Sequence, residues 1–247
     1  MRKHENVMIK NVLFDFDDTL FDHRHSSREG LRAVWKRFTC FQEMSLEELE
    51  LEHAEILEQI HFSHVLFGKM TIEEARAERF KFLFLNRGVE VDFNTAENAA
   101  QIYRMAYQKN RRRSEGAEEI LKRFKKEFKI GIITNNLISE QKEKLEFLEL
   151  TDYIDLMVTS EEARVPKPDP QIFNLTLTKL NAKPEETVMI GDSWEHDIMG
   201  AHNAGMKCIW LNHNKIPCPD PAIALEVRTL KNPEYIKSLF STGSFNK

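Results

Sequence analysis

Short apolar runs rich in Val, Ile, Leu and Phe occur near the N-terminal end and throughout the second half of the chain. Their length and β-branched content predict strands at residues 12–14, 129–133, 156–160, 188–190, 207–211 and 225–230. Amphipathic segments between them predict helices at residues 114–126, 139–148, 171–180, 195–204 and 233–240. Strands separated by helices pair in parallel through right-handed crossovers. The pattern therefore predicts an α/β fold built on a Rossmann-like parallel sheet.

The segment from residue 21 to residue 110 has a different pattern, without a comparable strand signal. Three helix-start signatures, each a capping residue followed three positions later by Glu, begin at Ser45, Thr71 and Asn94. Apolar residues recur behind them at helical spacing. We therefore predict that residues 21–110 form an all-helical insert, and that residues 1–20 and 111–247 together form the α/β domain.

The first apolar run ends in acidic and hydroxyl residues, namely Asp15, Asp17, Asp18 and Thr19. If the extended backbone persists, alternation places Asp15 and Asp17 on the same side of the strand. Adjacent carboxylates repel each other, so both remain ionised only beside a cation or ordered hydrogen-bond donors. The run predicts a metal site or an acid/base pair, and a surface β-turn is the alternative.

The strand at residues 129–133 also stops at polar side chains, Thr134, Asn135 and Asn136. Ligands of open α/β sheets bind at the carboxyl ends of the strands, so Thr134 and Asn135 are candidates to hold a phosphate oxygen. The same residues suit the N-terminal cap of the next helix, and the two interpretations are compatible.

Lys167 lies between Pro166 and Pro168, which restrict the backbone on both sides of it. A lysine in so stiff a loop is a candidate for a fixed counter-charge to a phosphate or carboxylate, and a solvated surface charge is the alternative. Asp169 and Pro170 predict the start of the following helix, because they suit its N-cap and first helical position.

Asp192 follows the strand at residues 188–190 and lies beside Asp15 and Asp17 if the sheet is parallel. Such a cluster of oxygen ligands suits a hard cation such as Mg²⁺. No His or Cys occurs in these motifs at the spacing of a zinc site, so zinc is disfavoured.

In their order and at their strand ends, these four motifs resemble those of the haloacid dehalogenase-like hydrolase superfamily. The resemblance implies that Asp15 is a nucleophile forming an aspartyl-phosphate and that Asp17 is the general acid and base. It also implies that Thr134 and the backbone N–H of Asn135 hold the phosphate. Lys167 then steadies the nucleophile and the phosphoryl group.

The resemblance further implies a Mg²⁺ site formed by the carboxylates of Asp15 and Asp192 and the backbone carbonyl of Asp17. Asp197 would order a metal-bound water rather than touch the metal. Family members that displace halide lack an acid at the position of Asp17, so this chain resembles a phosphatase. The helical insert corresponds to the family's mobile cap domain, which shields the intermediate from water and selects the substrate.

Substrate contacts are expected close to the nucleophile and in the linkers to the cap. Asp18 and Phe21 follow Asp15 closely, and the Phe21 ring is able to stack on a base, with hinge packing as its alternative. Asn135 is expected to contact the phosphate. Asn136 departs from the Thr-Asn-Gly sequence of close relatives, which changes the turn but keeps the preceding Thr and Asn.

Residues 15–21, 130–135 and 208–212 resemble the bacterial pyrimidine 5′-nucleotidase subgroup, so a nucleoside 5′-monophosphate is the first substrate hypothesis. A sugar-phosphate phosphatase, including one acting on an acylneuraminate phosphate, is the main alternative. A phosphomutase and a non-catalytic metabolite sensor are the alternatives from other functional classes.

Composition agrees with a soluble intracellular enzyme, and the resemblance implies a small phosphorylated metabolite as its partner. The net charge of −5 gives no reason to expect binding to a nucleic acid polymer or a membrane. The three cysteines lack motif spacing, which fits a reducing cytoplasm. Residues 1–6 show no apolar signal region, and no apolar run reaches membrane-spanning length. We expect a cytoplasmic monomer or homodimer.

Overall fold

The computed structural model describes residues 8–65 and 68–241. Residues 1–6, on which the argument against a signal region rests, lie outside these ranges. The chain divides into two compact units, Met1–Phe21 with Arg113–Lys247, and Asp22–Arg112. We call the first the sheet unit and the second the helical unit.

The sheet unit is built on six parallel strands in the order β3-β2-β1-β4-β5-β6. The strands are β1 (Asn11–Phe14), β2 (Lys129–Thr134), β3 (Leu156–Thr159), β4 (Thr187–Gly191), β5 (Lys207–Leu211) and β6 (Leu225–Val227). Phe14, the last residue of β1, pairs with Ile132 and Ile190, so β1, β2 and β4 end close to one level. The predicted α/β class with a Rossmann-like parallel sheet is confirmed.

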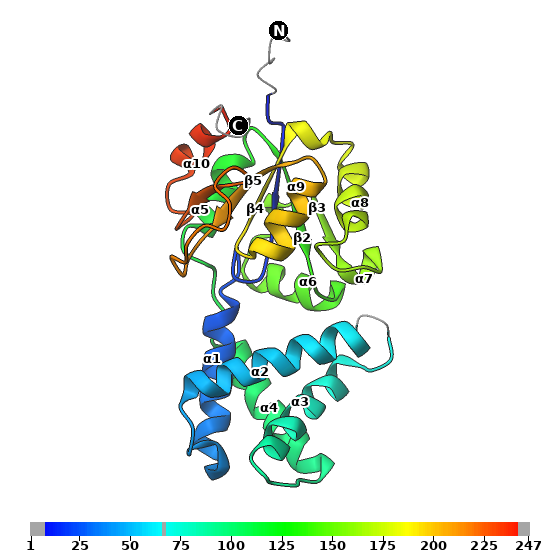
Figure 1. The fold of residues 1–247 in the computed structure, drawn as a ribbon, viewed down its shortest axis with the longest axis vertical. Helices are drawn as coiled ribbons and strands as arrows, with labels where there is room; N and C mark the ends of the chain where they lie inside the picture. The colour runs from blue at the N-terminus through cyan, green and yellow to red at the C-terminus, as the bar shows by residue number, and fades with distance from the viewer. Residues whose placement is uncertain (1–7, 66–67, 242–247) are drawn as a thin grey trace. The chain divides into compact units, whose positions relative to one another are not determined.

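Different helices cover the two faces of this sheet (Figure 1). The helices of the sheet unit are α5 (Ala117–Phe124), α6 (Ile138–Phe147), α7 (Ser160–Ala163), α8 (Pro170–Leu180), α9 (Gly200–Asn203) and α10 (Pro233–Leu239). Leu13 of β1 belongs to the same buried apolar cluster as Phe173 of α8. Phe14 faces the other way, where its ring contacts Phe124 of α5, which in turn contacts Phe240 after α10. Burial on both faces explains why the central strands are continuously apolar.

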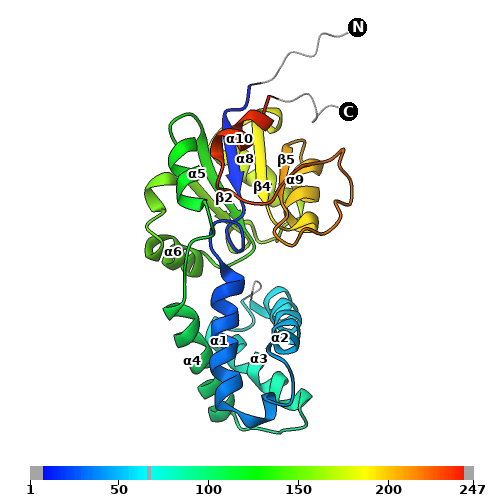
Figure 2. The ribbon, with the colours of Figure 1, turned by 90° about the vertical axis from the view of Figure 1, so that its left-hand side faces the viewer.

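The helical unit contains α1 (His23–Arg37), α2 (Leu46–Ile60), α3 (Ile72–Asn86) and α4 (Phe93–Lys109). Helix α1 packs against α2 and α4, and α3 also packs against both (Figure 2). The predicted starts of α2 and α3 are confirmed, because Ser45 and Thr71 each form a capping box with the Glu three residues later.

Three local predictions need correction. Helix α4 is capped by Asp92, whose side chain accepts from the Thr95 N–H at 2.8 Å, and not by Asn94. The segment after Phe21, expected as a linker, is helical from His23, because Asp22 caps the first turn of α1. The helix expected over residues 195–204 begins as a π-helix, Trp194–Met199, before α9.

None of the helices in the described part of the chain combines the length and the apolar character needed to cross a membrane.

Candidate active site

Polar residues gather where β1, β2 and β4 end. Asp15 follows β1, Thr134 is the last residue of β2, and Asp192 follows β4. Strand β1 lies between β2 and β4, and the Asp15 N–H donates to the carbonyl of Ile190 at 2.9 Å. Parallel pairing therefore brings the three predicted residues to one edge of the sheet, the usual place for a ligand in this class of fold.

Lys167 is buried among oxygen atoms at this edge. Its Nζ donates to Asp15 Oδ1 at 2.6 Å, to Asp197 Oδ1 at 2.6 Å and to the carbonyl of Ile133 at 2.8 Å. Its side chain is only 2% exposed, so the alternative of a solvated surface charge is wrong. The ammonium instead lies fixed between two carboxylates.

Burial and the neighbouring charges set the protonation of this group. Burial raises the pKa of Asp15 from 3.8 to about 7; Lys167 opposes this rise, and the nearby Asp197 carboxylate adds to it. Burial alone would lower the pKa of Lys167, but the two carboxylates bonded to it raise it above its ordinary value. Lys167 therefore stays charged, and Asp15 shares that single cation with Asp197.

Three acids at this edge have the arrangement of a cation site. Among the described residues, Asp15, Asp192 and Asp197 each offer a carboxylate oxygen, and these oxygens lie within 4.8 Å of one another. One lysine cation does not balance three carboxylates when all are ionised. An all-oxygen donor set with excess negative charge fits a hard divalent cation such as Mg²⁺.

Asp197 is turned into the site by the wide turn that precedes α9. Its Oδ2 accepts from the Ser193 N–H at 3.0 Å, and its side chain is 1% exposed. The Ile198 N–H reaches back five residues to the Ser193 carbonyl at 3.3 Å, which is the bond of a π-helical turn. Asp197 is therefore a buried member of the acid cluster that also bonds Lys167.

Asn135 clamps the backbone of the loop that carries Lys167. Its Nδ2 donates to the Lys167 carbonyl at 2.9 Å, and its Oδ1 accepts from the Lys167 N–H at 2.6 Å. The predicted start of α8 is confirmed at the other end of the loop, where the Asp169 side chain accepts from the Gln171 N–H at 2.8 Å. The loop is therefore held on both sides of the lysine.

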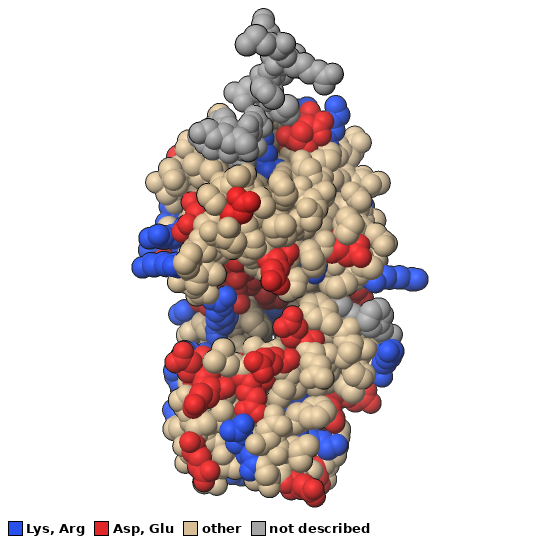
Figure 3. All heavy atoms as spheres, viewed as in Figure 1, with Lys and Arg blue, Asp and Glu red and all other residues tan. Residues whose placement is uncertain are grey.

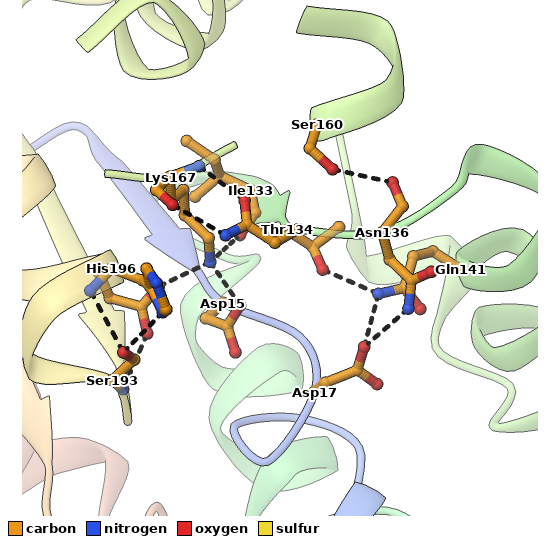
Figure 4. A network of polar contacts seen from close by, with 12 residues as sticks. Asp15, Asp17, Ile133, Thr134, Asn136, Gln141, Ser160, Lys167, Ser193 and His196 are labelled. Atoms are coloured by element: carbon orange, nitrogen blue, oxygen red, sulfur yellow. Dashed lines mark hydrogen bonds and ion pairs between the residues drawn. The ribbon is translucent and has the colours of Figure 1, made fainter. Parts of the chain in front are cut away.

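Asp15 and Asp17 have different hydrogen-bond partners, although the Asp17 charge is near enough to contribute to the raised pKa of Asp15. Figure 4 shows Asp15 linked to Lys167, whereas Asp17 is linked to Gln141 and Asn136 in a separate part of the network. Strand β1 ends at Phe14, so the two-residue alternation does not continue through Asp17. The two neighbouring carboxylates are therefore held by different side chains, Lys167 for Asp15 and residues of α6 and the turn before it for Asp17.

Two partners of Asp17 were missed in the sequence. Lys144 Nζ donates to Asp17 Oδ1 at 2.5 Å, and Gln141 Nε2 donates to Asp17 Oδ2 at 2.8 Å. Both side chains are buried on α6. The available signal was their position, because Gln141 and Lys144 fall on the same helical face as the buried Leu145 and Leu148, where apolar residues are expected.

Asn136, the departure from the common Thr-Asn-Gly sequence, also reaches this acid. Its Nδ2 donates to Asp17 Oδ2 at 3.3 Å, and its Oδ1 accepts from the Leu137 N–H at 2.8 Å. Its carbonyl accepts from the hydroxyl of Ser160 at 3.3 Å (Figure 4). The Asn side chain thus fixes the turn and adds a donor that Gly lacks.

Asp18 and Phe21, which follow Asp15 in the sequence and were expected to contact the substrate, differ in accessibility. Asp18 is half-buried and adopts a left-handed backbone with φ of 63°. Phe21 is fully buried, with its ring 6.2 Å from that of Phe16 and 4.9 Å from Lys144 Nζ. The expectation that Phe21 stacks on a base is therefore corrected, because packing occupies its ring.

Comparison with known proteins places this geometry in a family. The model of the haloacid dehalogenase-like hydrolase family matches residues 12–211. A glyceraldehyde 3-phosphate phosphatase of Pyrococcus furiosus is 32% identical over 84% of this chain and 82% of its own length. The N-acylneuraminate-9-phosphatase of Homo sapiens is 29% identical over 84% of each chain.

Two further relatives are a nucleotidase and a hydrolase solved with bound magnesium. The pyrimidine 5′-nucleotidase YjjG of Escherichia coli is 43% identical over 98 residues, which cover 39% of this chain and 44% of that protein. The solved structure of the HAD-hydrolase YfnB of Bacillus subtilis, bound to magnesium, is 26% identical, with a TM-score of 0.74 over 94% of this chain and 99% of that one. The matched family model, the relatives and the shared fold show that this chain belongs to the haloacid dehalogenase-like hydrolase family.

Proposed function

We propose that this protein is a Mg²⁺-dependent phosphomonoesterase that acts through an aspartyl-phosphate on Asp15. The observation that carries the proposal is the buried contact of 2.6 Å between Asp15 and Lys167 at the edge of the sheet. An anionic nucleophile approaches an anionic ester only where positive charge offsets their repulsion. Lys167 supplies one such charge in a fixed position.

Two transfers complete the proposed reaction. A carboxylate oxygen of Asp15 attacks phosphorus as the ester P–O bond breaks, and protonated Asp17 gives its proton to the leaving oxygen. Asp17, now a carboxylate, takes a proton from water as that water attacks the phosphorus of the aspartyl-phosphate. The Asp15–phosphorus bond then breaks, which releases inorganic phosphate and restores Asp15. Lys167, Thr134 and the Asn135 N–H hold the phosphoryl oxygens throughout.

The acid cluster is the proposed place for the metal. Asp15 and Asp192 would bind Mg²⁺ with their carboxylates and Asp17 with its backbone carbonyl, while Asp197 holds Lys167 and orders water. When bound, the cation supplies Lewis-acid stabilisation of the charge on the transferring phosphoryl group. The magnesium-bound YfnB structure and the 4.8 Å grouping of carboxylate oxygens support this proposal.

A nucleoside 5′-monophosphate is the first proposed substrate, supported by the 43% identity of a segment to the pyrimidine 5′-nucleotidase YjjG. Sugar phosphates form the second candidate class, supported by the phosphatases that match along 82% to 84% of their own length. Because the Phe21 ring is buried, recognition of a base requires other residues. We propose that the helical unit supplies them, in the role of the family's cap.

Phosphate release from a panel of nucleoside monophosphates and sugar phosphates tests the substrate class. With Mg²⁺ present, pyrimidine monophosphates are expected to show the highest kcat/KM, by roughly tenfold or more over sugar phosphates, because a pocket that pairs polar groups rejects substrates lacking them. A preference for a sugar phosphate would retain the mechanism and replace the substrate. Phosphate transfer to a second sugar position, with little release to water, would establish a phosphomutase instead.

Gly191→Ala is expected to damage the site through Asp197. A Cβ on Gly191 would lie 2.3 Å from Asp197 Oδ2, so the Asp197 side chain must shift, which disturbs its bonds to Ser193 and Lys167. Overpacking of this kind lowers the free energy of unfolding by about 1–3 kcal/mol. Urea denaturation and phosphate release should both decline. If stability to urea and phosphate release are both unchanged, the position of Asp197 matters neither for folding nor for activity.

We also infer a small phosphorylated metabolite as the only class of partner, and a reducing cytoplasmic location. All three cysteines lie among the described residues and are free. On the face shown in Figure 3, acidic and basic side chains of the described residues are interspersed, without a continuous basic area for a nucleic acid. A monomer and a homodimer are both compatible with this function.

A further inference from the structure

A second polar network lies beside Asp15 and is centred on Asp17. Both carboxylate oxygens of Asp17 receive hydrogen bonds from α6 or from the turn before it. Oδ1 accepts from Lys144 at 2.5 Å, and Oδ2 accepts from Gln141 at 2.8 Å and from Asn136 at 3.3 Å. We call Gln141 and Lys144 the α6 pair.

Both side chains of the α6 pair are buried, so their bonds to Asp17 are not chance contacts at the surface. The Lys144 side chain is 4% exposed, and Asp17 is the acid bonded to it. A buried ammonium is strongly unfavourable unless a carboxylate and further contacts compensate it. Here the compensation comes from Asp17 and from the face of the Phe21 ring, 4.9 Å away.

Gln141 connects the acid to the proposed phosphate-holding residue. Its Nε2 donates both to Asp17 Oδ2 and to Thr134 Oγ1, each at 2.8 Å (Figure 4). Its Oε1 is buried without a hydrogen-bond partner among the described residues. The two donated bonds therefore orient the amide, while its buried oxygen is left without a hydrogen bond among the described residues.

We propose that Gln141 and Lys144 are positioning residues that aim the Asp17 carboxyl group for proton transfer to the leaving oxygen and from the attacking water. This inference rests on the proposed function. A carboxylate bonded through both oxygens to one rigid helix has little freedom to rotate. Because proton transfer requires hydrogen-bond geometry, loss of either donor leaves Asp17 present but poorly directed.

Leaving-group dependence tests this role, because only substrates with a poor leaving group need a proton from Asp17. The measurement is kcat/KM with Mg²⁺ for an alkyl phosphate and for p-nitrophenyl phosphate, whose phenolate leaves without protonation. In Lys144→Met and Gln141→Leu, the ratio of the alkyl to the nitrophenyl value is expected to fall by roughly tenfold to a hundredfold. Lys144→Arg, which keeps a cation able to bond a carboxylate, is expected to recover most of the ratio.

Lys142→Met is the matched control, because Lys142 lies on the same helix and is exposed. Its ratio should equal that of the wild type. Equal losses on both substrates in the α6-pair variants, or no loss on either, would overturn the positioning role. If a thermal-unfolding assay shows that Lys144→Met does not fold, Gln141→Leu, which removes no charge, tests the positioning role by the same ratio of kcat/KM values.

The proposed function and the role of the α6 pair are overturned by different results. Absence of phosphate release by the wild type, or an Asp17→Asn variant whose ratio is unchanged, would overturn the proposed function. A lowered ratio in Asp17→Asn together with an unchanged ratio in Gln141→Leu and Lys144→Met would leave the proposed function standing and overturn only the role of the α6 pair.

Discussion

Asp15→Asn is expected to abolish phosphate release, with a loss on the order of a thousandfold or more, while the protein stays folded. The amide preserves the shape of the side chain but cannot attack phosphorus to form the covalent intermediate. Lys167 keeps its bonds of 2.6 Å to Asp197 and 2.8 Å to the Ile133 carbonyl, so the site retains its framework. Single-turnover phosphate release and circular dichroism measure the two parts of this result.

The stability of Asp15→Asn is expected to depend on pH in a defined direction. Burial raises the pKa of Asp15 from 3.8 to about 7. The stability that protonated Asp15 gives the folded state is therefore fully present below pH 3.8 and is lost as the pH rises through about 7. In chelator, the variant should therefore gain stability relative to wild type as pH rises from about 5 to about 8. Urea denaturation at several pH values measures this gain.

Asp152→Asn is the matched control for both measurements, because it removes an exposed acid from the same unit. It should retain activity and show no comparable change with pH. Near-normal phosphate release by Asp15→Asn would exclude the covalent route. A stability difference from wild type that does not grow with pH would mean that Asp15 is not held in the protonated form by burial.

Removal of divalent cations is expected to abolish phosphate release, and excess Mg²⁺ is expected to restore this activity. Stabilisation of the transferring charge by a metal amounts to several kcal/mol, which corresponds to roughly a hundredfold or more in rate. The chelated protein keeps Lys167, but three acids have carboxylate oxygens within 4.8 Å of one another at the same site. Phosphate release in EDTA and after addition of Mg²⁺ is the direct measurement.

Thermal unfolding supplies a readout of binding that does not depend on activity. Mg²⁺ binds the folded state, so it should raise the melting temperature of the wild type in a concentration-dependent way. Asp192→Asn should lose most of this increase, because it removes one carboxylate ligand. Glu195→Gln, an exposed acid three residues away, should keep it. Full activity in chelator would contradict the proposed Mg²⁺ site. So would a Mg²⁺-dependent rise in melting temperature that is as large in Asp192→Asn as in the wild type.

The hydrogen bonds of Asp17 show where local rules end. Alternation holds only while the backbone is extended, and β1 ends at Phe14. Beyond that point the chain turns, with Asp18 at a φ of 63°. A spacing of two residues therefore says nothing about which way Asp17 points. Its direction follows instead from the packing of α6 against this turn.

The class of fold and most of the polar residues at the sheet edge follow from local patterns in the sequence. Apolar runs, capping residues and alternation of strands with helices are local signals, because hydrogen bonds and burial within a short segment produce them. Parallel pairing then brings the strand ends together, so Asp15, Thr134 and Asp192 could be placed from pattern alone. Lys167 could be proposed from its stiff loop, although not its depth of burial.

Contacts between side chains from distant segments follow from tertiary packing and not from local patterns. Gln141 and Lys144 lie 124 and 127 residues from Asp17, and nothing local to either segment specifies that they touch. Contacts at such separation depend on how α6 packs, on which face it buries and on how the turn after β1 closes. The burial of Phe21 depends on the same packing, because a side chain is accessible or enclosed only relative to neighbours supplied by distant parts of the chain.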